Sequence, residues 1–122
     1  MKKLIQSFGY AFKGVAYAAV TQLNFRIHMF ATVLAVLFGF YLHIAANEWL
    51  WIGVCITLVL VTEIFNTMIE TLTDIISPGY NEKAGRVKDM SAGAVVIAAL
   101  FALITAVIIY VPKLLLVIYH AA

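Results

Sequence analysis

The chain has 122 residues, a formal net charge of +2, 65% hydrophobic residues and only 11% charged residues. A soluble domain is about half apolar and about a quarter charged, and so short a chain cannot hide this much apolar surface in its own core. The composition therefore excludes an ordinary water-soluble domain and favours a single integral membrane domain. The small net charge gives no reason to expect nucleic acid as a partner, and the single cysteine excludes an internal disulfide.

The first 25 residues are predicted to form an amphipathic helix. Lysines at positions 2, 3 and 13 are interspersed with apolar residues that recur at spacings of three or four: Leu4, Phe8, Ala11, Phe12, Val15 and Ala19. Such a helix lies in the plane of a membrane surface, with its apolar face toward the lipid. We therefore expect a surface helix at residues 1–25. The alternative is a loose N-terminal tail.

Three long apolar runs follow, and each is long enough to cross a hydrocarbon core of roughly 30 Å as a helix. A polar turn at Asn47 and Glu48 separates the first two runs, and Ser77-Pro78-Gly79 ends the second. Pro112 is expected to end the third run, because proline lacks a backbone donor. The predicted fold is all-α, with transmembrane helices at 27–46, 49–76 and 89–111 and a loop at 77–88.

The distribution of positive charge predicts the orientation of the chain. Seven of the eight lysines and arginines lie before the first span or in the loop between the second and third, and only Lys113 falls on the other side. Cytoplasmic flanks of membrane proteins are enriched in these residues. We therefore expect a multi-pass protein of the cytoplasmic membrane, with its N-terminus and the loop at 77–88 in the cytoplasm.

The second span carries polar residues that are unusual in lipid: Glu63, Asn66, Glu70 and Asp74. Their spacings of three, four and four place them within an arc of roughly 80° on one helix face. Glu63 lies 14 residues after Trp49, roughly 21 Å into the membrane. Ionisable groups at such depth are costly and mark functional sites. The alternative is that the stripe only links helices by hydrogen bonds.

The stripe and the adjoining loop indicate phosphoryl transfer. A deep carboxylate such as Glu63 is suited to accept a proton from an alcohol, and shallower carboxylates can hold Mg²⁺ together with phosphate oxygens. No GxxxxGK[ST] or GxGxxG motif occurs, which excludes the soluble kinase folds. The loop adds groups that suit a phosphate-bearing ligand, although flanking charge alone would explain some of them: Tyr80, Asn81, Glu82, Lys83, Arg86, Lys88 and Asp89.

These motifs resemble the small prokaryotic diacylglycerol kinase family. Residues 63–74, EIFNTMIETLTD, are similar to that family's ExxNxxxExxxD signature, and Lys88-Asp89 matches its second motif. Lys13-Gly14 and Asn24-Phe25 also match, so the resemblance covers nearly the whole chain. It implies one membrane kinase domain over residues 1–122 and a homotrimer with active sites shared between protomers. It also implies transfer of the γ-phosphate of ATP to a lipid hydroxyl, with Mg²⁺.

The same resemblance implies roles for individual residues. Glu63 would be the proton acceptor and, with Asn66 and Lys3, would contact the lipid substrate. Glu70 would bind both metal and nucleotide, and ATP would contact a further set of residues: Tyr10, Tyr80, Asn81, Lys88 and Asp89. One departure concerns Gln22, which stands where the family usually has a metal-binding glutamate. An amide oxygen binds a cation less strongly, so the metal and nucleotide contact expected at Gln22 is in doubt.

The expected substrate is undecaprenol. Residues 24–28, NFRIH, resemble the NFxxH pattern of the undecaprenol kinase branch, and KDMSAGAV at 88–95 favours the same branch. Diacylglycerol is the alternative, since both lipids present a hydroxyl at the interface on apolar chains. His28 is interpreted as either a site residue or an interfacial residue.

A different class of function is a non-enzymatic transporter or channel subunit. It would use the polar residues of the second span, Glu63, Asn66 and Glu70, as an ion pathway. Such a pathway needs polar groups through the full thickness of a span, whereas the outer halves of these spans are apolar. The pattern therefore favours chemistry at the cytoplasmic surface.

Overall fold

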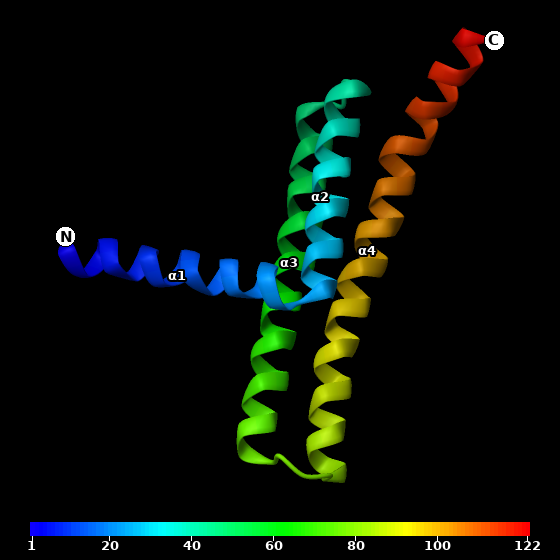
Figure 1. Ribbon diagram of the computed structural model, residues 1–122. Helices are drawn as coiled ribbons and strands as arrows, with labels where there is room; N and C mark the ends of the chain where they lie inside the picture. The colour runs from blue at the N-terminus through cyan, green and yellow to red at the C-terminus, as the bar shows by residue number, and fades with distance from the viewer.

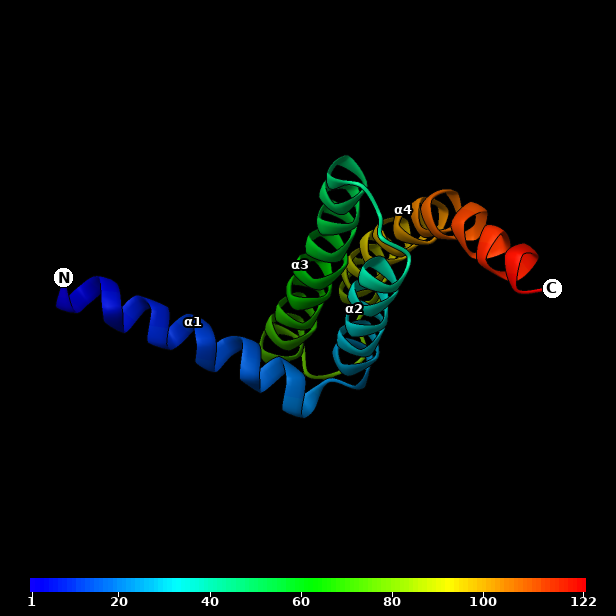
Figure 2. The ribbon, with the colours of Figure 1, turned by 90° about the horizontal axis from the view of Figure 1, so that it is seen from above.

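The structure, a computed structural model, describes residues 1–122 and contains four helices: α1 (Lys2–Thr21), α2 (Leu23–Tyr41), α3 (Ala46–Ile76) and α4 (Glu82–Ala121). Helices α2, α3 and α4 run side by side, while α1 crosses them at a steep angle and extends away (Figures 1 and 2). The α2–α3 turn lies at one end of the bundle and the α3–α4 loop at the other (Figure 1). The predicted all-α architecture is confirmed.

Helices α2, α3 and α4 are long and apolar enough to span a membrane, which confirms the three predicted spans by length and composition. Only 15 of the 122 residues are buried, so most apolar side chains of the bundle face outward. Such a surface suits a lipid environment, since water disfavours exposed apolar area. With 31 and 40 residues, α3 and α4 exceed the roughly 20 that a hydrocarbon core requires, so both extend beyond it.

A single residue, Gln22, separates α1 from α2, and its extended backbone (φ −111°, ψ 112°) turns the chain. Arg26 donates hydrogen bonds to the carbonyl oxygens of Ala19 at 3.2 Å and Val20 at 2.7 Å. The last carbonyl groups of a helix lack hydrogen-bond donors within the helix, and the Arg26 side chain donates to two of these groups. Arg26 therefore helps to hold α1 at its angle to the bundle, in addition to its expected place among the flanking cations.

The boundaries of the first two helices differ from the prediction. Helix α1 ends at Thr21 instead of residue 25, because the extended backbone of Gln22 interrupts the helix. Helix α2 covers Leu23–Tyr41 instead of 27–46. Its end is followed by a turn in which His43 has a φ of 51°, a left-handed conformation that no helix continues through.

The loop after α3 is shorter than expected. It covers only residues 77–81, because α4 begins at Glu82. The side-chain oxygen of Asn81 accepts hydrogen bonds from the backbone N–H groups of Lys83 at 2.9 Å and Ala84 at 3.1 Å. This is the geometry of an N-cap, which stabilises a helix start. Seven residues of the expected loop are therefore helical.

Pro112 does not end the last helix, and that prediction was wrong, since α4 continues to Ala121. Proline in a helix interior removes one backbone hydrogen bond and bends the helix, but neighbouring contacts can carry the helix past it. Here the next residue, Lys113, pairs with Glu48 of α3 at 3.1 Å and holds α4 against α3. The C-terminal part of α4 then turns away from α2 and α3 (Figure 2).

The bundle is packed most tightly near the α2–α3 turn, where a small apolar cluster is buried: Leu42, Ile44, Ile52 and Ile109. In the same region Gly39 of α2 lies directly against the indole ring of Trp49 on α3. A Cβ atom built on Gly39 would lie 2.5 Å from Cη2 of that ring. Glycine is therefore required here because the two helices approach too closely for any side chain.

Replacing Gly39 with alanine should destabilise the contact between α2 and α3. The added methyl group overlaps a rigid aromatic ring, and overpacking of this kind typically costs about 1–3 kcal/mol. We expect a lower midpoint of thermal unfolding in detergent, measured as loss of the monodisperse size-exclusion peak after heating. Gly53→Ala on α3 is the matched control, because nothing lies within 4 Å of its added Cβ. Equal midpoints for the two variants would contradict this account.

Candidate active site

Two polar residues of α3, Glu63 and Asn66, are buried within the bundle, with only 2% and 6% of their surface exposed. The Ser91 hydroxyl of α4 donates a hydrogen bond to Oδ1 of Asn66. The amide group of Asn66 donates in turn to Oε1 of Glu70 at 3.2 Å. Asn66 thus links α3 to α4 by a hydrogen bond, which is the role that the alternative interpretation of the stripe assigned to it. It also orients the carboxylate of Glu70, one turn further along α3.

Glu63 meets a basic side chain from α2. The Nε2 atom of His28 lies 3.7 Å from Oε2 of Glu63, and the two side chains are 21% and 3% exposed. His28 comes from the first turns of α2, where Phe25, one turn earlier, is fully buried. Residues three apart on a helix share a face, so the buried Phe25 keeps His28 directed into the bundle. Of the two interpretations of His28, its position fits that of a site residue.

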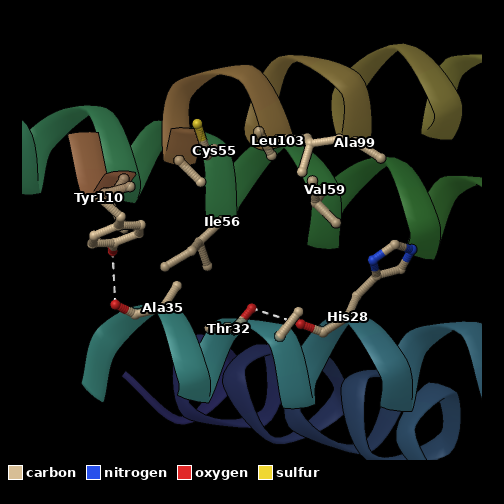
Figure 3. Close-up of a pocket in the computed structure, with 13 residues that line it drawn as sticks. His28, Thr32, Ala35, Cys55, Ile56, Val59, Ala99, Leu103 and Tyr110 are labelled. Atoms are coloured by element: carbon tan, nitrogen blue, oxygen red, sulfur yellow. Dashed lines mark hydrogen bonds between the residues drawn. The ribbon is translucent and has the colours of Figure 1, made fainter. Parts of the chain in front are cut away.

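An apolar cavity of about 260 Å³ lies between α2, α3 and α4 (Figure 3). His28 lies at one end of it, and at the other the Tyr110 hydroxyl donates to the Ala35 carbonyl at 2.7 Å. The walls between these ends are mostly small and aliphatic, and they include Val59, Ala99, Ala102, Leu103 and Ala106. A cavity lined in this way favours hydrocarbon over water, because it offers water few hydrogen-bond partners.

Charged residues gather where α3 and α4 meet the loop at 77–81. Lys88 of α4 forms an ion pair with Asp74, the outermost member of the polar stripe. Asp89 is exposed and forms no ion pair, and Tyr80 is 99% exposed. Asn81 uses its side-chain oxygen to cap α4. Partly exposed ion pairs contribute little to stability, so Lys88 can exchange its partner for an anionic ligand at small cost.

Some of the site residues predicted on α1 do not lie near the buried polar stripe of α3. Lys3 and Tyr10 are exposed on the N-terminal half of α1, which extends away from the other helices (Figure 1). Only the C-terminal half of α1 packs on α3, where Ala18 is buried. Gln22 is half-buried at the α1–α2 junction. Within one chain, Lys3 and Tyr10 are therefore separated from Glu63.

The chain has no preformed metal cluster, since no three His, Cys, Asp or Glu side chains gather closely enough to bind an ion. Mg²⁺ usually takes one or two protein carboxylates and completes its coordination with water and phosphate oxygens. Glu70 suits this role, because it is half-buried and only its Oε1 atom accepts a hydrogen bond from the chain. The donor set therefore fits an Mg²⁺ ion that arrives with a nucleotide.

Sequence reasoning missed Ser91 and left the role of His28 open. Ser91 stands at the start of a long apolar run, where a lone hydroxyl is common and carries little information. Its one signal is a position three residues after Lys88, on the same face of the helix. His28 bears the same relation to Phe25, but only the packing of α2 on α3 reveals that this face meets Glu63.

Comparison with known proteins assigns the chain to a family. Residues 9–110 match the family model described as prokaryotic diacylglycerol kinase. A Synechocystis protein named diacylglycerol kinase is 39% identical over 113 residues, which are 92% of this chain and 65% of that protein. A diacylglycerol kinase of Escherichia coli K12 is 36% identical over 103 residues, 84% of each chain. An undecaprenol kinase of Bacillus subtilis is 32% identical over 114 residues, 93% of each.

The chain thus spans just under two thirds of the Synechocystis protein and most of the other two relatives. The matched region contains the polar stripe of α3, its partners His28 and Ser91, and the cavity that ends at Tyr110. The relatives bear both names, so they agree on phosphoryl transfer to a lipid and differ on which lipid. The chain belongs to the prokaryotic diacylglycerol kinase family, a family of lipid kinases.

Proposed function

We propose that this chain transfers the γ-phosphate of ATP to the hydroxyl of undecaprenol and so makes undecaprenyl phosphate. The observation that carries the proposal is the position of Glu63, a carboxylate that is 2% exposed and contacts His28 at one end of an apolar cavity. A carboxylate at this position can contact the hydroxyl of an alcohol whose hydrocarbon chain lies in the membrane. The charged loop end of α3 and α4 can bind a nucleotide that comes from the aqueous phase.

Glu63 is the proposed proton acceptor. It takes the hydroxyl proton as the lipid oxygen bonds to the γ-phosphorus and the bond to the ADP oxygen breaks. The start of the lipid chain occupies the cavity between α2, α3 and α4, which holds the hydroxyl beside the carboxylate. Asn66, fixed by Ser91, adds polar contacts to the lipid head, and Lys3 of a neighbouring protomer is proposed to add another. Positioning of this kind is a large part of catalysis in phosphoryl transfer.

ATP is proposed to bind at the loop end of α3 and α4. Lys88 exchanges Asp74 for a phosphate, and its neighbours around the loop complete the nucleotide contacts: Tyr80, Asn81 and Asp89. Glu70 and Gln22 are the residues that would hold Mg²⁺, and the ion would neutralise charge on the phosphates. The hydrogen bond that Asn66 donates to Oε1 of Glu70 would orient this carboxylate for the role.

The proposed active unit is a homotrimer in the cytoplasmic membrane, with residues 1–122 as one kinase domain in each protomer. Lys3 and Tyr10 belong to the N-terminal half of α1, which extends away from the other helices (Figure 1). They are therefore available to complete the site of a neighbouring protomer. The outward-facing apolar residues of α2, α3 and α4 supply surface for such packing. The positive charges on α1 and the loop favour a cytoplasmic N-terminus.

Diacylglycerol is the second candidate substrate, and its product would be phosphatidic acid. The Escherichia coli and Synechocystis relatives carry that name, whereas the Bacillus subtilis relative is named an undecaprenol kinase. We favour undecaprenol because the NFRIH segment at 24–28 ends in the histidine that contacts Glu63. A transporter or channel subunit is less well supported, because the polar stripe is followed toward the α2–α3 turn by an apolar cavity.

The proposed function is tested with purified protein in detergent, labelled ATP, Mg²⁺ and each lipid alcohol supplied separately. We expect undecaprenol to be phosphorylated faster than diacylglycerol. Glu63→Gln should lose activity by roughly 10²–10⁴-fold, the usual contribution of a general base, while it still assembles. Glu48→Gln is the matched control, since it removes a carboxylate of α3 at the α2–α3 turn, the end opposite to the proposed ATP site. Turnover by Glu63→Gln at the wild-type rate would remove this residue from the base role.

Filling the cavity should weaken lipid binding and leave nucleotide binding intact. Ala102 lines the cavity, and Ala102→Phe places a ring where the lipid chain is proposed to lie. We expect the KM for undecaprenol to rise about tenfold or more, since a buried chain segment of two or three CH₂ groups contributes roughly 0.8 kcal/mol for each. The KM for ATP should not change. Ala94→Phe, at an exposed position of the same helix, is the control.

Restoring a carboxylate at the α1–α2 junction should strengthen metal binding. Gln22→Glu offers a charged oxygen in place of an amide oxygen, and Mg²⁺ prefers carboxylates. We expect half-maximal activity at a lower Mg²⁺ concentration, measured at saturating ATP and lipid. Gln6→Glu on the exposed N-terminal half of α1 controls for the added negative charge. An unchanged or weaker Mg²⁺ dependence would count against a metal contact at residue 22.

A further inference from the structure

The burial of Glu63 creates a second requirement that the transfer step itself does not meet. Each turnover leaves one proton on this carboxylate, and the carboxylate must lose it before the next cycle. The Glu63 side chain is only 3% exposed, so water cannot collect the proton directly. The proton therefore needs a neighbouring group that can bind it and reach water.

His28 is the one basic side chain within 4 Å of Glu63. Its Nε2 atom lies 3.7 Å from Oε2, and the side chain is 21% exposed, against 3% for Glu63. His28 stands in the first turns of α2, near the α1–α2 junction, which the proposed function places at the cytoplasmic membrane surface where water is present. The other charged group that acts on the Glu63 carboxylate is Glu70, two turns further along α3, and no lysine or arginine pairs with Glu63 or His28. Imidazole binds and releases protons near neutral pH more readily than any other side chain.

The position of the ring also argues against simple packing. His28 stands at the end of a cavity whose lining is mostly apolar and includes Val59 and Ala99 (Figure 3). A hydrocarbon side chain would fill this position without the desolvation cost of an imidazole. The backbone carbonyl of His28 accepts a hydrogen bond from the Thr32 hydroxyl at 2.8 Å, but this bond does not involve the imidazole ring. The ring's one charged contact is Glu63.

We propose that His28 carries the transferred proton from Glu63 to water. This inference rests on the proposed function, in which Glu63 accepts the hydroxyl proton of the lipid alcohol. After transfer, the protonated Glu63 gives the proton to Nε2 of the neutral imidazole and returns to a carboxylate. The imidazolium then releases a proton to water and becomes neutral again, so the cycle is balanced. His28 acts through Glu63 and is a positioning and relay residue.

The separation of 3.7 Å is longer than a hydrogen bond, so a small closure must precede proton transfer. Such contacts commonly tighten when substrate binds and water is displaced. A lipid chain that enters the cavity beside His28 would restrict the ring toward Glu63, because the opposite side is then filled. Proton removal would in this way be coupled to occupancy of the lipid site.

The test compares His28→Ala and His28→Gln with wild type in detergent, with undecaprenol, ATP and Mg²⁺ at saturation. We expect kcat to fall by about tenfold or more in both variants, with the KM for each substrate changed less than twofold. Added imidazole should restore the kcat of His28→Ala in a concentration-dependent manner, because it fills the space left by the ring. Imidazole should not restore Glu63→Gln, which lacks the acceptor. His120→Ala, at the exposed end of α4, is the control.

Two outcomes would overturn the relay. One is a wild-type kcat in His28→Gln, which keeps the size of the side chain but cannot carry the proton. Another is a kcat of folded His28→Ala that imidazole leaves unchanged. Where His28→Ala fails to give a monodisperse size-exclusion peak, the kcat of His28→Gln decides by itself. Failure of the proposed function has a different signature: wild-type protein inert toward every lipid alcohol, or Glu63→Gln as active as wild type.

Discussion

The burial of Glu63 is the constraint on which the rest of the structure depends. A carboxylate removed from water costs several kcal/mol unless neighbouring groups compensate for the lost solvation. The two other spans supply those groups, since α2 brings His28 to the carboxylate and α4 brings Ser91 to the adjoining Asn66. The polar face of α3 therefore dictates how the three helices are arranged, because it must meet α2 and α4 at the same depth.

The two ends of the bundle serve different purposes. Near the α2–α3 turn, the contact of Gly39 with Trp49 and the ion pair of Glu48 with Lys113 hold the helices together. At the loop end, the ion pair of Lys88 with Asp74 is partly exposed and contributes little to stability. The end at the α2–α3 turn is therefore rigid and the loop end is adaptable. This combination suits a protein that must bind a charged ligand at the loop end while its fold stays intact.

The apolar cavity and the loop end lie on opposite sides of Glu63 along the helices. The cavity is lined mostly by apolar side chains, and the loop end carries the partly exposed ion pair of Lys88 with Asp74. Helix α1 joins the bundle between these regions, and Arg26 holds it at an angle that leaves its N-terminal half extending away from the other helices (Figure 1). A lipid kinase needs this geometry, because its two substrates come from different solvents.

The sequence by itself determined the three apolar helices, the separate helix at the N-terminus and the stripe of polar residues on α3, because each follows from hydrophobic length or helical periodicity within one segment. It also indicated the family through the spacing of Glu63, Asn66 and Glu70. Only the tertiary structure decided that His28 and Ser91 meet this stripe, that Asn81 starts α4 early and that α4 continues past Pro112. The physical reason is that these features depend on contacts between segments distant in sequence, or on local capping that competes with helix-breaking residues, and periodicity within one helix records neither.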